Sequence, residues 1–245
     1  MLQITHQDKP VVFIADLHLS EDRPDINAAF HRFIEQLSDI DALYIMGDFV
    51  EIWLGDDLCS AFHSENARIL KSASQRFPIY FTHGNRDFLI GKRFAKESGM
   101  TLLPEIQPIT LFGTKTLIMH GDSLCIDDVA YQKYRRYTFN KALQSAFTKL
   151  PKKFRHAVYA KIKKASHHQK ANKNATIMDV APREVERVLE HYQAKRIIHG
   201  HTHRPKLHNL PESKQRWVVG DWHRNTSALF VTRNSAELIE IPLNQ

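Results

Sequence analysis

VVFIADLHL, residues 11–19, is an apolar run that ends in an aspartate and a histidine two positions apart. A short continuous apolar run bounded by polar residues is typical of a strand that is buried on both faces. In extended backbone, the side chains of residues i and i+2 point to the same side. The stretch therefore predicts a buried strand whose carboxyl end presents Asp16 and His18 to one shared ion.

Further apolar runs have the length and composition of buried strands, at 42–46, 78–82, 116–120, 196–200, 216–220, 228–232 and 237–241. Helical patterns between the early runs predict helices over 25–38, 60–75 and 90–98. The first half of the chain thus alternates strand and helix, whereas the tail is strand after strand. This order predicts an α/β fold with a mixed sheet and favours two layers of sheet flanked by helices.

Polar motifs also follow four of the other predicted strands: Gly47-Asp48, Gly84-Asn85-Arg86-Asp87, His120-Gly121-Asp122 and Gly200-His201-Thr202-His203. In open α/β sheets, sites form at the carboxyl ends of strands. Carboxylate, amide and imidazole ligands together suit Mn²⁺, Fe or Zn²⁺ better than Ca²⁺. One such motif alone is weak evidence, but five of them in order, each after a strand, favour a metal site over coincidence.

Composition limits the class of protein. The chain has 245 residues with 42% apolar content, enough for one large domain or one domain with an insertion. Its two cysteines, Cys59 and Cys125, lie far apart in the sequence, which favours a reducing cytoplasm over a disulfide framework. The N-terminal sequence lacks the pattern of a signal peptide, and no apolar run is long enough to span a bilayer.

One basic segment stands out in the charge distribution. Residues 129–178 contain thirteen Lys or Arg and no acidic residue, so the rest of the chain has a net charge of −6. Such a segment favours phosphates, nucleic acid or an anionic bilayer as a partner, and the alternative is a solvated basic face. We interpret 128–175 as an insertion of two or three helices, interrupted at Pro151. It carries an apolar stripe at helical spacing, made by Phe139, Leu143, Phe147, Leu150, Phe154, Val158 and Ile162.

The ordered motifs D-x-H, G-D, G-N-x-D, H-G-D and G-H-x-H resemble those of the calcineurin-like metallophosphoesterases, over residues 16–203. The resemblance implies a double β-sandwich flanked by helices, with two metal ions bridged by Asp48. Asp87 and Asp122 are expected to orient the ligands. One ion would take Asp16, His18, Asp48 and His203, and the other would take Asp48, Asn85, His120 and His201.

Arg86 departs from the broad family, which usually has histidine at this position. Arginine stays protonated and is a poor general acid, but its planar fork suits phosphate oxygens. The substitution therefore favours a leaving group that needs little protonation, such as a phosphate monoester. With GNRDFLIG, GDFVEIW, HGDSLCIDD, IMDV and the basic insertion, the chain resembles the branch of the family that hydrolyses UDP-2,3-diacylglucosamine.

That closer resemblance implies attack of water on the α-phosphorus, which gives UMP and 2,3-diacylglucosamine 1-phosphate (lipid X), with two Mn²⁺ as cofactors. It implies a core over 1–127 and 176–245 and a cap over 128–175 that holds the acyl chains and faces an anionic membrane. A location on the cytoplasmic face of the inner membrane follows. The implied catalytic residues are Asn85, Arg86 and His120, and the implied substrate contacts are Asn85, Arg86, Asp128, Ser166, Lys170, Lys173 and His201.

Two other hypotheses compete with the lipid-precursor hydrolase. The basic segment is also compatible with a metal-dependent nuclease or phosphodiesterase, although Arg86 argues against it and we expect no nucleic-acid partner. A non-enzymatic interaction module could keep the fold without the metals. Every expected metal ligand is present in this sequence, which disfavours that hypothesis.

Overall fold

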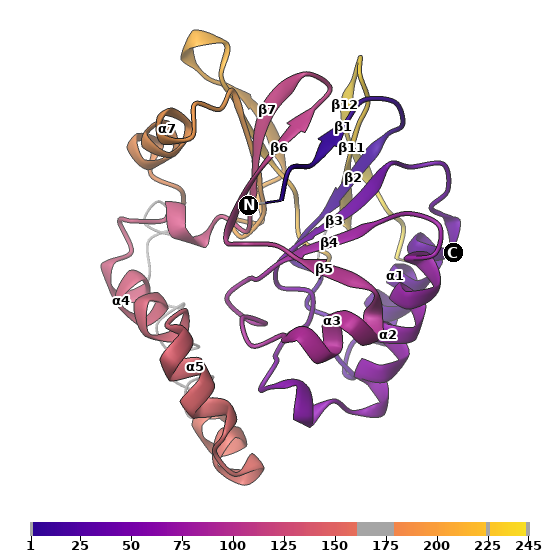
Figure 1. Cartoon of the computed structure of the whole chain (residues 1–245), viewed down its shortest axis with the longest axis vertical. Coiled ribbons are helices and arrows are strands. Elements are labelled where there is room, and N and C mark those ends of the chain that lie inside the picture. The colour runs from indigo at the N-terminus through magenta and orange to yellow at the C-terminus, as the bar shows by residue number, and fades with distance from the viewer. Residues whose placement is uncertain (1, 161–178, 224–225, 244–245) are drawn as a thin grey trace.

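The computed structural model describes residues 2–160, 179–223 and 226–243. Its strands form two six-stranded sheets (Figure 1). The first sheet contains, in spatial order, β12 (Ala236–Glu240), β11 (Ser227–Val231), β2 (Val11–Ile14), β3 (Ala42–Met46), β4 (Ile79–Thr82) and β5 (Met100–Leu102). The second contains β1 (Thr5–His6), β6 (Ile106–Leu111), β7 (Thr114–Met119), β8 (Arg196–His199), β10 (Gln215–Val218) and β9 (Lys206–Asn209).

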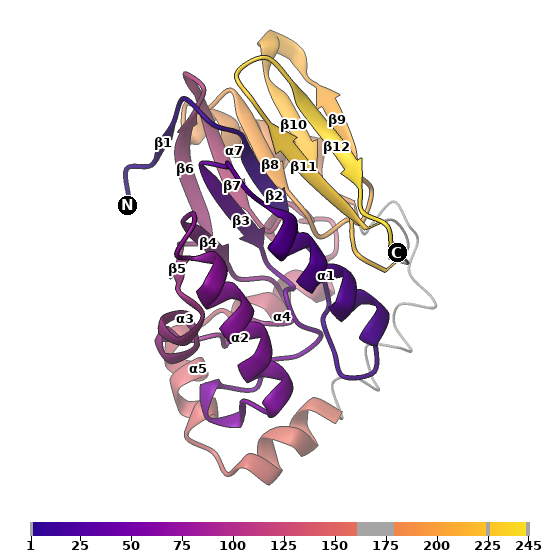
Figure 2. The same cartoon turned by 90° about the vertical axis from the view of Figure 1, so that its right-hand side faces the viewer.

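Helices cover the outer faces of both sheets (Figure 2). One core joins the first sheet to α1 (Pro24–Gln36), α2 (Ala61–Ala73) and α3 (Lys92–Ser98). A second core lies between the sheets, where Phe13 and Tyr44 meet Ile118 and Ile198. A third joins the second sheet to α7 (Pro182–His191). The predicted double β-sandwich flanked by helices is therefore confirmed, and each predicted strand is present.

Parallel pairing brings the carboxyl ends of several strands to one end of the sandwich. In the first sheet β2, β3, β4 and β5 run parallel, and in the second sheet β7, β8 and β10 run parallel. The runs that make β2 and β3 are apolar and buried along their whole length, as a sheet covered on both sides requires. All five predicted motifs follow these strands.

The insertion forms separate short helices that project beside the sandwich (Figure 1). These are α4 (Val129–Thr138), α5 (Lys141–Thr148) and a helix over 152–160, with Asn140 capping α5 and Pro151 preceding the restart. The predicted apolar stripe is only partly packed. Phe147 contacts the core between the first sheet and α1, α2 and α3, which we call the helix-side core, but Leu143, Leu150 and Phe154 are exposed. The chain turns at Asn140 and Pro151, so the residues of the stripe do not share one face. Ile162 lies outside the described residues.

Ion pairs attach the described part of the insertion to the core in two places. Near the start of the insertion, Asp122 accepts hydrogen bonds from the Tyr131 hydroxyl and Arg135 Nε, each at 2.7 Å. Farther along, the Arg155 guanidinium pairs with Asp57 and is 1% exposed. Among the described residues, no helix is long and apolar enough to cross a bilayer.

Candidate metal centre

The loops after β2 and β3 run side by side beyond the ends of the strands. Asp16 N–H donates to Gly47 O at 3.1 Å, and His18 N–H donates to Asp48 O at 2.9 Å. A parallel bridge from Leu19 to Val50 then closes the pair. This ladder fixes the backbone from which Asp16, His18 and Asp48 project.

The ligand backbone is not extended, so the reason given above for the spacing of Asp16 and His18 was wrong. Asp16, His18, Asp48, His201 and His203 have φ angles of 53°, 49°, 51°, 67° and 54°. Non-glycine residues rarely occupy this left-handed region, and strained residues of this kind cluster at functional sites. The side chains nevertheless converge as expected.

Close backbone approach explains two of the motif glycines. A Cβ at Gly84 would lie 2.2 Å from Asp48 Oδ1, and a Cβ at Gly200 would lie 2.3 Å from Asp16 Oδ2. Both carboxylates use this space for hydrogen bonds. Asp48 Oδ1 accepts from Arg86 N–H at 2.8 Å, and Asp16 Oδ2 accepts from His201 N–H at 2.7 Å. Any larger residue at either glycine would displace a candidate metal ligand.

The side chains of the five motifs form two overlapping clusters that share Asp16. The first contains Asp16, His18 and His203, and the second contains Asp16, Asp48 and His120, with ligand atoms within 4.8 Å of one another. His203 Nε2 lies 3.4 Å from Asp16 Oδ1, and His18 Nε2 lies 3.7 Å from Asp48 Oδ2. The clusters join strand ends from both sheets.

Asn85 and His201 complete the second cluster. His120 Nε2 lies 3.1 Å from Asn85 Oδ1 and 3.2 Å from His201 Nδ1. Asp48 Oδ1 lies 3.9 Å from His120 Nε2. The structure thus brings all seven predicted metal ligands together, and Asp48 lies between the two groups, where a bridging carboxylate is needed.

The donor atoms fit a pair of cations. Asp16 Oδ1 and His18 Nε2 are buried without a hydrogen-bond partner among the described residues. Buried polar atoms left in this state are costly unless something else satisfies them. Two carboxylates, four imidazoles and one amide are the ligands that borderline divalent ions accept. The fit is therefore good for two divalent transition-metal ions.

The electrostatics of the protein without metal point the same way. Burial alone lowers the pKa of His120, but Asp48, Asp16 and Asp122 outweigh burial and raise it to about 9. Burial is also outweighed at His203, where Asp16 and Asp221 raise the pKa to about 10. The carboxylates thus attract positive charge into the centre. Because metal binding requires neutral imidazoles, divalent ions would replace these protons.

Three partners of the histidine ligands were not predicted from the sequence. His18 Nδ1 lies 3.1 Å from Glu51 Oε2, and His203 Nδ1 lies 3.3 Å from Asp221 Oδ2. His120 Nδ1 donates to Met46 O at 2.9 Å. Each partner faces Nδ1, so Nε2 of all three histidines is directed into the centre. The Gly220-Asp221 pair after a predicted strand repeats the Gly47-Asp48 pattern and could have been found.

Asp87 and Asp122 differ in the segments to which they are hydrogen-bonded. Asp87 accepts from Phe49 N–H at 2.7 Å and from Gly84 N–H at 2.8 Å, so it ties together the loops that carry Asp48 and Asn85. Burial and the charge of Asp48 raise the pKa of Asp87 to about 7. Asp122 instead receives the hydrogen bonds of the insertion described above. Its carboxylate connects the insertion to the loop that carries His120.

The predicted substrate residues are only partly placed. Arg86 lies at the centre, with Nη1 3.6 Å from Glu51 Oε1, and its buried Nε has no hydrogen-bond partner among the described residues. The Asp128 carboxylate caps α4 by accepting from Tyr131 N–H at 3.0 Å. Ser166, Lys170 and Lys173 lie outside the described residues.

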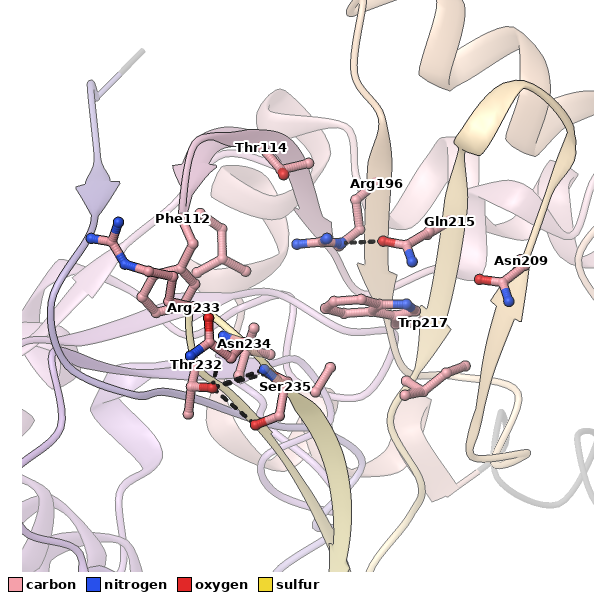
Figure 3. A pocket seen from close by; sticks show the side chains of 14 residues that line it. Phe112, Thr114, Arg196, Asn209, Gln215, Trp217, Thr232, Arg233, Asn234 and Ser235 are labelled. Atoms are coloured by element: carbon pink, nitrogen blue, oxygen red, sulfur yellow. Dashed lines mark hydrogen bonds between the residues drawn. The ribbon is translucent and has the colours of Figure 1, made fainter.

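A cavity of about 380 Å³ lies at the other end of the sandwich (Figure 3). Its lining includes Thr114 and Arg196, the first residues of β7 and β8, whereas the metal cluster follows the last residues of these strands. Arg196 stacks 3.8 Å above the Trp217 ring, and burial lowers its pKa to about 10. Because its lining contains no Asp, Glu, His or Cys, this cavity is not the candidate reaction centre.

Comparisons with known proteins agree with this geometry. The sequence pattern of the family described as calcineurin-like phosphoesterase matches residues 9–205. A protein of Shewanella piezotolerans named UDP-2,3-diacylglucosamine hydrolase is 48% identical over 235 residues, which cover 96% of this chain and 99% of that protein. A protein of the same name from Shewanella oneidensis is 49% identical over 232 residues, covering 94% and 97% of the two chains.

Proposed function

The chain belongs to the calcineurin-like phosphoesterase family, and we propose that it is the metal-dependent hydrolase of UDP-2,3-diacylglucosamine in lipid A biosynthesis. The observation that carries the proposal is the convergence of the complete predicted ligand set, with Arg86 beside it, in a chain nearly half identical to hydrolases of that name over almost its whole length.

Two divalent ions would be held by the seven converging side chains. Asp16, His18 and His203 would take one ion, and Asn85, His120 and His201 would take the other, with Asp48 shared. Mn²⁺ is the proposed ion: the donor set suits Mn²⁺, Fe or Zn²⁺, and the resemblance to the UDP-2,3-diacylglucosamine hydrolases favours Mn²⁺ among them. Two doubly charged ions and the two aspartate ligands together carry a net charge of about +2. This positive charge favours an anionic diphosphate and its transition state.

In sites of this kind, bound metal ions lower the pKa of a water molecule and neutralise charge that develops on phosphoryl oxygens. The protein groups supply orientation. Asn85 and His201 face the α-phosphate, and Arg86 holds its oxygens in a fixed position. An arginine side chain is a poor general acid, so the proposed role of Arg86 includes no proton transfer, and the lipid X phosphate leaves as an already stable monoester anion. UMP is the other product.

The inserted helices over 128–175 are proposed to form the lipid-binding cap on a core of 1–127 and 176–245. An apolar contact between the insertion and the core supports this role: the ring centroid of Phe139 lies 5.8 Å from that of Phe88, beside the loop that carries Arg86. Each buried methylene contributes about 0.8 kcal/mol, so two acyl chains would dominate binding. Asp128, Ser166, Lys170 and Lys173 are proposed contacts for the polar part of the substrate.

The outer side of the cap is proposed to lie against the cytoplasmic face of the inner membrane. Val129, Tyr137, Leu143 and Phe154 are 74%, 56%, 47% and 53% exposed, and they belong to a stretch, residues 129–178, with thirteen lysines or arginines and no acid. Exposed apolar side chains among basic residues favour an anionic bilayer surface. Co-sedimentation with anionic but not neutral vesicles, lost in 0.5 M salt, would support this location.

The deciding experiment is hydrolysis of UDP-2,3-diacylglucosamine by Mn²⁺-loaded protein in ¹⁸O water, with the masses of both products measured by mass spectrometry. Labelled UMP and unlabelled lipid X are expected, because attack is at the α-phosphorus. Labelled lipid X would instead place attack at the other phosphorus. Absence of turnover, together with cleavage of a simple phosphodiester or a nucleic acid, would refute the lipid-precursor substrate and keep the two-metal chemistry.

A further inference from the structure

The two halves of the metal centre differ in the group that contacts Nδ1 of their histidine ligands. In one half, Glu51 Oε2 lies 3.1 Å from His18 Nδ1, and Asp221 Oδ2 lies 3.3 Å from His203 Nδ1. In the other half, His120 Nδ1 donates to the neutral carbonyl of Met46 at 2.9 Å. Carboxylates behind an imidazole raise its basicity as a ligand and add negative charge near the ion, whereas a carbonyl adds only a dipole.

The direct ligands differ in the same direction. Asp16 is predicted for the half with His18 and His203, although its carboxylate also lies within 4.8 Å of ligand atoms of Asp48 and His120, whereas the half with His120 adds the neutral amide of Asn85. Asp48 is shared and does not distinguish them. Two carboxylates, Glu51 and Asp221, therefore support the first half alone, and the second half has no carboxylate that it does not share.

The fold holds both supporting carboxylates in place. Glu51 N–H donates to Leu19 O at 3.0 Å, which extends the ladder between the two ligand loops. Asp221 precedes Trp222, which is fully buried and packs edge-on against Phe33 of α1 at 5.6 Å. The backbone N–H of Trp222 also donates to the backbone oxygen of Asp16 at 3.1 Å. The positions of these carboxylates are thus set by the core.

We propose that Glu51 and Asp221 are positioning residues that make the Asp16–His18–His203 half the high-affinity metal site, so that this half fills first. The inference rests on the proposed two-metal function. Asp221 contributes more than Glu51, because the Arg86 guanidinium 3.6 Å from Glu51 offsets part of its charge. The Asn85–His120–His201 half fills second and exchanges its ion faster.

The test is a stepwise Mn²⁺ titration of the full-length metal-free protein, followed by electron paramagnetic resonance, which separates free, isolated and spin-coupled Mn²⁺. In the wild type, the first equivalent is expected to give an isolated signal and the second a coupled one. Asp221→Asn should raise the dissociation constant of the first step about tenfold, and Glu51→Gln should raise it severalfold. Asn85→Ala should weaken only the second step.

Glu97→Gln is the matched control, because Glu97 is exposed on α3 and pairs only with Arg93, at 3.4 Å, among the described residues. It should leave both steps unchanged, and melting curves of all metal-free variants would verify folding. The inference is overturned if Asp221→Asn and Glu51→Gln leave the first step unchanged, or if Asn85→Ala weakens the first step. Failure of the wild type to bind two Mn²⁺ would instead refute the proposed function itself.

Discussion

Asp57→Ala is expected to release the helix over 152–160 while leaving the core folded. Arg155 Nη1 donates to Asp57 Oδ1 at 2.8 Å and to Leu54 O at 2.7 Å, and the guanidinium is almost completely buried. The alanine variant keeps the bond to Leu54 but leaves the buried positive charge without its counter-ion. The near end of the cap has its own attachment at Asp122, so the loss should stay local.

The magnitude follows from the unequal burial of the two partners. Removal of one member of a buried ion pair costs about 3–5 kcal/mol, whereas exposed pairs contribute about 1 kcal/mol or less. Arg155 is 1% exposed, but the Asp57 side chain is 45% exposed, so water replaces part of the lost interaction. An intermediate cost of about 2 kcal/mol is expected, which is roughly a 30-fold rise in local opening.

Hydrogen–deuterium exchange of the helix over 152–160 measures this opening directly. Its amides should exchange roughly 30-fold faster in Asp57→Ala, whereas those of α4 should keep their wild-type rates because Asp122 still holds Tyr131 and Arg135. Asp127→Ala, which removes an exposed pair with Arg183, is the control. Unchanged exchange over 152–160, or equal acceleration throughout the protein, would refute the reasoning.

Three further predictions concern the metal centre. Gly84→Ala places a Cβ 2.2 Å from Asp48 Oδ1, so it should lower bound Mn²⁺ below two per chain and reduce kcat/KM at least 100-fold, measured by metal analysis and kinetics. Arg86→His should lower kcat/KM by about the same factor as Arg86→Gln if Arg86 acts as a clamp; rescue by histidine would indicate an acid. In metal-free protein, His120 and His203 have pKa values of about 9 and 10, so their protonated forms stabilise the fold. The denaturant concentration at the unfolding midpoint should therefore fall as pH rises from about 7 to 10. It should not fall over this range in Mn²⁺-loaded protein.

Most of the strands that the sequence predicted have continuous apolar runs, and only β12, with two glutamates, was predicted from an interrupted run. β6, IQPITL, was missed because its burial alternates along the strand and Pro108 interrupts the pattern. β9, KLHN, has no buried residue and exists because it pairs with β10. α7 was missed although its apolar residues recur at helical spacing, since only Val185, Val188 and Leu189 are buried in a charged sequence. Local patterns fail where tertiary pairing supplies the stabilisation.

The direct ligands were predictable because each follows a strand, whereas the supporting contacts depend on how separate loops meet. Glu51 reaches His18 only because the loops after β2 and β3 form a ladder. Arg155 reaches Asp57 only because the chain turns at Pro151 and returns toward the core. Neither pairing has a signal in sequence spacing, since the partners are 33 and 98 residues apart.

The wrong backbone assignment for Asp16 and His18 still gave the right convergence, and the reason lies in the residues between the ligands. Leu17 and Leu19 are buried in the helix-side core, while Asp16 and His18 face the centre. Alternation of core and site residues thus survives the left-handed turns, because parallel ladder bonds continue past the strand end. Each left-handed non-glycine residue costs about 1–3 kcal/mol, which the ladder and the two buried leucines offset. The leucines of D-L-H-L therefore belong to the metal site as much as its ligands do: they hold the strained loop in the one conformation that presents both donors.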